Sequence, residues 1–121
     1  MATKVPVAGE IATVSGWGNT GPSNEAARQL QVIDFPVVDR TECAETYQRM
    51  ITLTENMICA GSETGAEDTC KGDSGGPMVV GGELAGIVSF GAGCAVPGYP
   101  GVYTNVAVLR DFISETTGVK V

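Results

Sequence analysis

The segment from residue 67 to residue 77 holds a high density of chemically active side chains. It reads EDTCKGDSGGP and combines hydroxyls, carboxylates and a cysteine with closely spaced glycines. Because Gly72 and Gly75 carry no side chain, the backbone around them is able to approach a bound group closely. The amides of Gly72 and Ser74 could then converge beside the Ser74 hydroxyl, which is an arrangement that suits an oxyanion. The segment therefore predicts a loop that could hold an oxyanion beside the Ser74 hydroxyl.

The same residues also have simpler interpretations. Gly-Asp-Ser-Gly-Gly is typical of a solvated turn capped by Asp73, and Asp68 taken alone is typical of a surface carboxylate. The chain contains no histidine, and histidine is the usual general base near neutral pH. A Ser-Lys dyad with Lys71 would not need one, but nothing in the sequence indicates the desolvated surroundings that would keep this lysine neutral.

Composition and charge exclude several classes of protein. A length of 121 residues predicts one domain, and a net charge of −7 with no cluster of basic residues argues against nucleic-acid and anionic-membrane partners. No apolar run approaches the roughly 18 residues that a transmembrane helix needs. The start, Met1 to Glu10, lacks the apolar stretch of a secretory signal.

The cysteines indicate the compartment. Cys43, Cys59, Cys70 and Cys94 are even in number and never form a Cys-x-x-Cys pair, which favours disulfides over a zinc site. No metal or cofactor is therefore expected. Disulfides form in oxidising compartments, so we expect a mature segment or recombinant fragment of a secreted parent protein.

Short strand-like runs separated by turn residues dominate the chain, as in closed barrels and sandwiches. Gly81-Gly82 predicts a tight hairpin turn, residues 19–27 a loop, and Trp17 a packing residue. The run 29–35 changes phase, which predicts a bulge or burial on both faces. The expected strands are Ala12–Trp17, Gln29–Phe35, a segment around Met57–Ala60, Pro77–Val80, Glu83–Phe90 and Gly101–Asn105.

Two helices are expected beside these strands. Asp39 and Glu42 form a possible capping box that opens a helix through about Arg49. A terminal helix over about residues 106–117 precedes Gly118 and is expected to lay one apolar stripe against the strands. The stripe consists of Val106, Leu109, Phe112 and Ile113.

The motif Gly-Asp-Ser-Gly-Gly-Pro, residues 72–77, resembles the nucleophile motif of the trypsin-like serine proteases. The resemblance covers nearly the whole chain from about Ile11 but only the C-terminal half of that family. It implies an all-β fold: a single six-stranded antiparallel Greek-key barrel over about residues 11–105, with an N-terminal tail 1–10 and the C-terminal α-helix. Further motifs in the family's order are Ser15–Gly18, Met57–Gly61, Gly86–Gly91 and Pro100–Tyr103.

The resemblance also implies roles for individual residues. Ser74 matches the nucleophile, the amides of Gly72 and Ser74 match the oxyanion hole, and Asp68 matches the base of a pocket that selects Arg or Lys side chains. Phe90 stands where the family usually has tryptophan, and Lys71 where an uncharged residue is common, so the pocket entrance is expected to be more positive. The implied substrate-binding set is Asp68, Thr69, Lys71, Ser89, Phe90, Gly91, Gly93 and Gly101.

The remaining implications concern order and covalent links. Asp73 resembles the aspartate that pairs with a new α-amino group after zymogen cleavage, and without that partner we expect Asp73 to be differently bonded and the Gly72 amide misplaced. The resemblance pairs Cys43 with Cys59 and Cys70 with Cys94. Each link closes a loop worth about 3 kcal/mol in the chain-entropy model.

Two functions follow as hypotheses. The first is the C-terminal half of a trypsin-like serine endopeptidase that cleaves after Arg or Lys, inactive alone because the family's catalytic histidine and aspartate lie in the other barrel. The second is a non-catalytic folded barrel or binding module. An exposed apolar face left by the missing N-terminal barrel makes a homodimer an expected partner arrangement.

Overall fold

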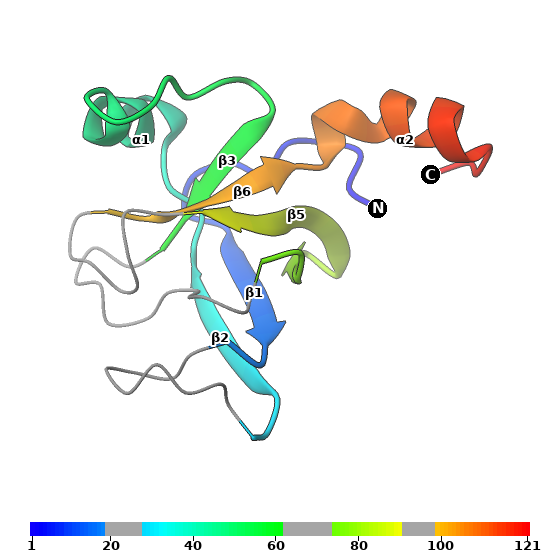
Figure 1. The fold of residues 1–121 in the computed structure, drawn as a ribbon, viewed down its shortest axis with the longest axis horizontal. Coiled ribbons are helices and arrows are strands. Elements are labelled where there is room, and N and C mark those ends of the chain that lie inside the picture. The colour runs from blue at the N-terminus through cyan, green and yellow to red at the C-terminus, as the bar shows by residue number, and fades with distance from the viewer. Residues whose placement is uncertain (19–27, 62–73, 91–98) are drawn as a thin grey trace.

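The strands expected from the sequence form one antiparallel sheet in a computed structural model of the protein (Figure 1). The structure describes residues 1–18, 28–61, 74–90 and 99–121, so the predicted loop 19–27 lies outside it. The helical elements in these ranges are α1 (Arg40–Tyr47), the 3-10 turn η1 (Ala107–Leu109) and α2 (Arg110–Thr117). The strands are β1 (Ile11–Gly16), β2 (Gln31–Pro36), β3 (Met57–Ala60), β4 (Pro77–Val80), β5 (Glu83–Phe90) and β6 (Gly101–Asn105).

The sheet closes on itself. Its strand order in the described residues is β2-β1-β4-β5-β6-β3, and β3 lying beside β6 completes a Greek key with β4 and β5. The two end strands meet where Val37 bridges Ala60, with the Val38 amide 2.9 Å from the Cys59 carbonyl and the Gly61 amide 3.0 Å from that of Pro36. This seam confirms the predicted all-β, six-stranded Greek-key barrel with a C-terminal helix.

Alternation along β1 decides which of its side chains fill the barrel. In β1, Ala12 and Val14 point inward and are buried, whereas Ile11 is 57% exposed. The register between β1 and β2 is continuous, and Val32 is 59% exposed. The predicted bulge or two-sided burial in the 29–35 run is therefore wrong. The interior contains Ala12, Val14, Phe35, Val37, Ile58, Ala60, Met78, Val80, Ala85, Val88 and Tyr103.

The β4–β5 hairpin has the turn that its sequence predicts. Gly81 and Gly82 take φ values of +60° and +80°. Positive φ at both central residues is the requirement of a type I′ turn, and glycine meets it without steric cost. The turn fixes the pairing of Val80 with Glu83 and of Val79 with Leu84, and an irregularity in the ladder shifts the register from Met78 onward.

Helix α1 covers the outer face of β3 and β6. Asp39 caps it, since one carboxylate oxygen accepts the amides of Thr41 at 2.9 Å and Glu42 at 3.1 Å. The helix ends at Tyr47 rather than near Arg49. A second buried cluster in the described residues lies under it and contains the Cys43–Cys59 disulfide, Tyr47 and Val102. The predicted pairing of these two cysteines is confirmed.

The C-terminal helix packs less than its apolar stripe predicts. Val106 is buried, but Leu109 and Ile113 are half-buried and Phe112 is 63% exposed. Figure 1 shows α2 continuing beyond the end of β6, so its far turns have no strand beneath them. Trp17 is likewise 57% exposed, against the expectation of a packing residue.

The helices in the described ranges are all too short to span a membrane.

The N-terminal segment contacts the barrel. Ala2 is buried, and its amide donates to the Leu84 carbonyl at 2.8 Å. Further along, the Gly9 amide donates to the Val37 carbonyl at 2.9 Å, and the Val37 amide donates to the Glu10 carbonyl at 2.8 Å. These bonds bring residues 8 and 9 beside the seam.

Replacing Asp39 with alanine should lower the free energy of unfolding by about 1 kcal/mol, because two amides in the first turn of α1 lose their acceptor. Urea denaturation monitored by circular dichroism measures this. Asp39→Asn keeps an acceptor and should retain most of the stability. Glu45→Ala, on the same helix but outside the cap, is the control. Equal stability of Asp39→Ala and the wild type would contradict the role of the cap.

Candidate active site

Ser74, the predicted nucleophile, lies exposed at one end of the barrel. Its hydroxyl donates to the main-chain carbonyl of Ser89 across 3.4 Å. This contact joins two segments of the predicted site that are 15 residues apart in the chain.

Backbone pairing places Ser74 there. The β4–β5 ladder continues beyond β4, because the Gly75 amide donates to the Val88 carbonyl and the Val88 amide to the Gly76 carbonyl, both at 2.9 Å. Gly75 has φ +87°, a conformation that L side chains rarely adopt. The glycine after Ser74 thus lets the chain turn sharply into the strand while the serine stays at the surface.

Ser89 lies at a bulge in β5. The register against β6 pairs Val88 with Tyr103 and Phe90 with Val102, which leaves Ser89 as the extra residue. Bulges re-aim a strand, and here the change occurs beside the Ser74 hydroxyl. Phe90, the next residue, is 39% exposed.

Gly101, another predicted substrate-binding residue, begins β6 and is buried. It pairs with Ala60 of β3, one step from the Val102–Phe90 pair. The start of β6 therefore lies at the same end of the barrel as the end of β5 and the start of β4. The fold brings Ser74, Ser89, Phe90 and Gly101 to this end.

Tyr47 supports this end of the barrel, although no pattern in the sequence points to it. Its hydroxyl donates to the Pro100 carbonyl at 2.6 Å, and its ring meets Tyr99 edge to face with centroids 5.6 Å apart. The bond ties α1 to the residue before Gly101. Tyr47 and Pro100 are 53 positions apart, beyond the reach of any local pattern.

The other predicted site residues lie outside the described part of the chain. They are Asp68, Thr69, Lys71, Gly72, Asp73, Gly91 and Gly93, together with Cys70 and Cys94 of the second predicted disulfide. The expectations for the oxyanion hole, the base of the pocket and the Asp73 ion pair stay predictions. Among the residues that are described, no group of His, Cys, Asp and Glu is arranged to hold a metal ion.

The described residues supply an exposed alcohol and one hydrogen-bond partner for it. A serine hydroxyl becomes a nucleophile when a neighbouring base accepts its proton. In the described residues the Ser74 hydroxyl donates to a carbonyl oxygen, which is a poor proton acceptor. The described residues therefore place the Ser74 hydroxyl at the surface, and its role as a nucleophile stays a prediction.

Comparison with protein families places this site in context. The model of the family described as Trypsin matches residues 2–113. The chain is 50% identical over 114 residues to trypsin eta of Drosophila erecta, covering 94% of this chain and 44% of that protein. It is 48% identical over 114 residues to trypsin alpha-3 of Lucilia cuprina, covering 93% of this chain and 68% of that protein. The chain is also 46% identical to trypsin-1 of Salmo salar over 96% of its own length and 47% of that protein's.

A solved structure shares the fold. Neuropsin, a serine protease expressed in the limbic system of mouse brain, superposes with a TM-score of 0.88 at 39% identity. The match covers 96% of this chain and 52% of neuropsin. The chain thus spans about half the length of several of the relatives that it matches.

Tyr47→Phe should lower the free energy of unfolding by about 1 kcal/mol, since it removes the bond to the Pro100 carbonyl and keeps the ring. Tyr99→Phe is the matched control. It keeps the ring contact between the two tyrosines and should cost less than about 0.5 kcal/mol. Chemical denaturation of both variants measures the difference. Equal losses would show that the Tyr47 hydroxyl does not anchor residue 100.

Proposed function

Because the chain belongs to the trypsin family, we propose that it supplies the C-terminal half of a serine endopeptidase that cleaves after Arg or Lys. Ser74 is the nucleophile, and the amides of Gly72 and Ser74 form the oxyanion hole. The observation that carries the proposal is the exposed Ser74 hydroxyl beside Ser89 at the bulged end of β5. Peptides and proteins with Arg or Lys are the substrates.

Selectivity for basic side chains rests on Asp68 in this proposal. A carboxylate at the base of a narrow pocket is costly to desolvate, and an arriving cation offsets that cost. Gly101 supports this assignment because it is buried at the same end of the barrel as Ser89 and Phe90. The positions proposed to complete the pocket are Thr69, Lys71, Gly91 and Gly93.

The chain alone is proposed to be inactive. With no histidine in the sequence, Ser74 lacks the base that the family's chemistry uses. Loss of the histidine from a serine triad lowers kcat by about 10⁶. The remaining acceleration over water requires an ordered oxyanion hole and bound substrate.

The missing base is proposed to come from an N-terminal barrel, in the parent protein or in another chain. The chain covers 44% of trypsin eta and 52% of neuropsin, which leaves room for a second barrel in proteins of that length. Exposed apolar side chains support a missing neighbour. Ile11 and Val32 lie on the outer face of the β1–β2 pair, and Trp17 and Phe112 are more than half exposed.

Self-association is the second way in which these exposed apolar side chains could be covered. A homodimer would bury the same apolar side chains when the other barrel is absent. Sedimentation at increasing concentration distinguishes the two cases, because a strict monomer at high concentration contradicts the homodimer. A non-catalytic binding module is the alternative function of the barrel.

Secretion of the parent protein is part of the proposal. The Cys43–Cys59 disulfide supports it, since such links form and persist in oxidising compartments. The second link, Cys70–Cys94, is proposed on the same ground.

Fluorophosphonate labelling tests the catalytic part of the proposal. The purified 121-residue chain should label no faster than its Ser74→Ala variant, because no base activates the hydroxyl. The full-length parent protein, cleaved to its mature form, should label at Ser74. Rapid labelling of the isolated chain would contradict the proposed dependence on a second barrel, and an unlabelled mature parent would contradict the role of Ser74.

Benzamidine titration tests the pocket separately, since binding an amidinium needs Asp68 but no general base. Asp68→Asn should weaken binding by at least about tenfold, as expected for loss of a desolvated charge partner. Glu45→Gln, on the exposed side of α1, is the matched control for net charge. Calorimetry gives both affinities. Equal binding by Asp68→Asn and the wild type would exclude Asp68 as the base of the pocket.

A further inference from the structure

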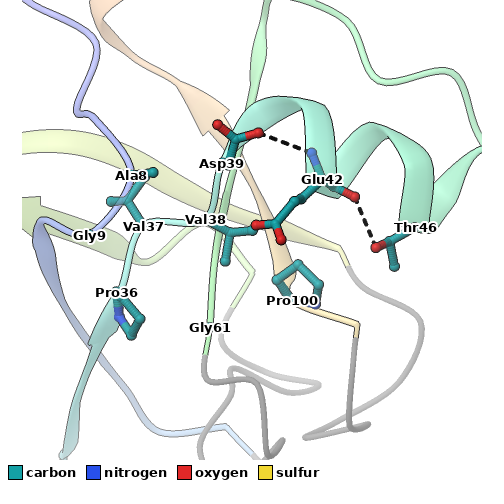
Figure 2. A pocket seen from close by; sticks show the side chains of 10 residues that line it. All are labelled: Ala8, Gly9, Pro36, Val37, Val38, Asp39, Glu42, Thr46, Gly61 and Pro100. Atoms are coloured by element: carbon teal, nitrogen blue, oxygen red, sulfur yellow. Dashed lines mark hydrogen bonds between the residues drawn. The ribbon is translucent and has the colours of Figure 1, made fainter.

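A hollow of about 420 Å³ lies beside the barrel seam, between the N-terminal segment, the end of β2 and helix α1 (Figure 2). Its volume falls within the range of small-ligand sites. The side chains that carry the argument are Pro36, Val38, Glu42, Thr46 and Pro100.

The walls of the hollow are apolar and fixed by the fold. Pro36, Val38 and Pro100 are half-buried, so each presents part of its surface to solvent. The seam bonds hold residues 36–38, and Tyr47 holds the Pro100 carbonyl. At Gly61 a Cβ would lie 3.1 Å from the Pro100 Cα, so the two backbones approach closely behind these walls. The walls are therefore preformed.

Glu42 brings a negative charge to this apolar surface. Figure 2 shows its carboxylate reaching between Val38 and Pro100, while the Asp39 carboxylate turns toward the helix end. Two hydrogen bonds hold the Glu42 backbone. Its amide donates to the Asp39 carboxylate, and its carbonyl accepts the Thr46 hydroxyl at 2.9 Å. Within the described residues its carboxylate makes no hydrogen bond or ion pair.

Arg40, two residues before Glu42 on the same helix, directs its guanidinium to main-chain carbonyls. The Arg40 guanidinium donates to the Met57 carbonyl at 2.7 Å. It also donates to the carbonyl of Thr54, which lies on the loop that precedes β3. Among the described residues that line the hollow, Asp39 and Glu42 are the charged ones. The whole chain carries −7, which favours approach of a cation. An occupant that fits both features has an apolar stem and a positive end.

We propose that this hollow binds one lysine or arginine side chain of a partner protein. The methylene stem lies on Pro36, Val38 and Pro100, and the charged end pairs with the Glu42 carboxylate. Long basic side chains cover apolar surface with their stems while the charge stays near water. The inference does not depend on the chemistry of Ser74.

Titration with Nα-acetyl-lysine methylamide tests the proposal, with binding followed by the backbone amide resonances of Val38, Glu42 and Thr46. The norleucine counterpart has the stem without the ammonium group. The lysine compound should bind with a millimolar dissociation constant and shift all three amides. Norleucine should bind about two- to fivefold more weakly, in line with a partly exposed ion pair.

Variants of α1 separate the contribution of the Glu42 charge to binding from that of the apolar walls. Glu42→Gln should weaken lysine binding about two- to fivefold and leave norleucine binding unchanged. Thr46→Lys places a cation one turn after Glu42, where it competes with the probe, and should weaken lysine binding at least as much. Glu45→Gln removes the same charge from the same helix outside the hollow and should have no effect. The proposal is overturned if lysine binds Glu42→Gln as well as the wild type, if norleucine binds as well as lysine, or if no pocket amide shifts.

Discussion

The backbone pairing of residues 75–80 with β5 is the constraint on which the rest of the site depends. It continues past the start of β4 through Gly75 and Gly76, so the chain delivers Ser74 next to Ser89. The other edge of β5 pairs with β6 and fixes the position of Gly101 at the same end of the barrel. Strand β5 thereby sets the positions of both segments and itself carries Ser89 and Phe90.

Helix α1 adds a second layer to this arrangement. The disulfide joins Cys43 in the helix to Cys59 in β3, and the Tyr47 hydroxyl reaches Pro100. Glu42, on the same helix, lies over the hollow beside the seam. Helix α1 is short and buries one face against the barrel. With that face it supports the start of β6, and it presents the Glu42 carboxylate to solvent. Its capping by Asp39 matters for both.

Local chemistry made much of the fold predictable from sequence. Two adjacent glycines predicted the turn at 81–82, and Asp39 predicted the start of α1. Contacts between distant residues were not predictable, because no pattern near Tyr47 points to Pro100. Apolar spacing also failed at Phe112, since periodicity identifies a face but not whether a neighbour covers it. At the site, the sequence indicated Ser74, Ser89 and Gly101 through a family motif, whereas the bulge at Ser89 arises from pairing with β6.

The barrel should open more easily at the seam between β2 and β3 than between its other neighbouring strands. Among the residues that the structure describes, one bridge and the bonds from Val38 and Gly61 close this seam, whereas the other neighbouring strands share ladders of several residue pairs. Segments held by few hydrogen bonds open at lower free energy than the whole domain. Amide protons at the seam should exchange with solvent before those in β5. An opened seam exposes two strand edges, and unpaired edges are where copies of a chain exchange strands or aggregate. The disulfide on Cys59 keeps β3 tethered to α1 during such an opening.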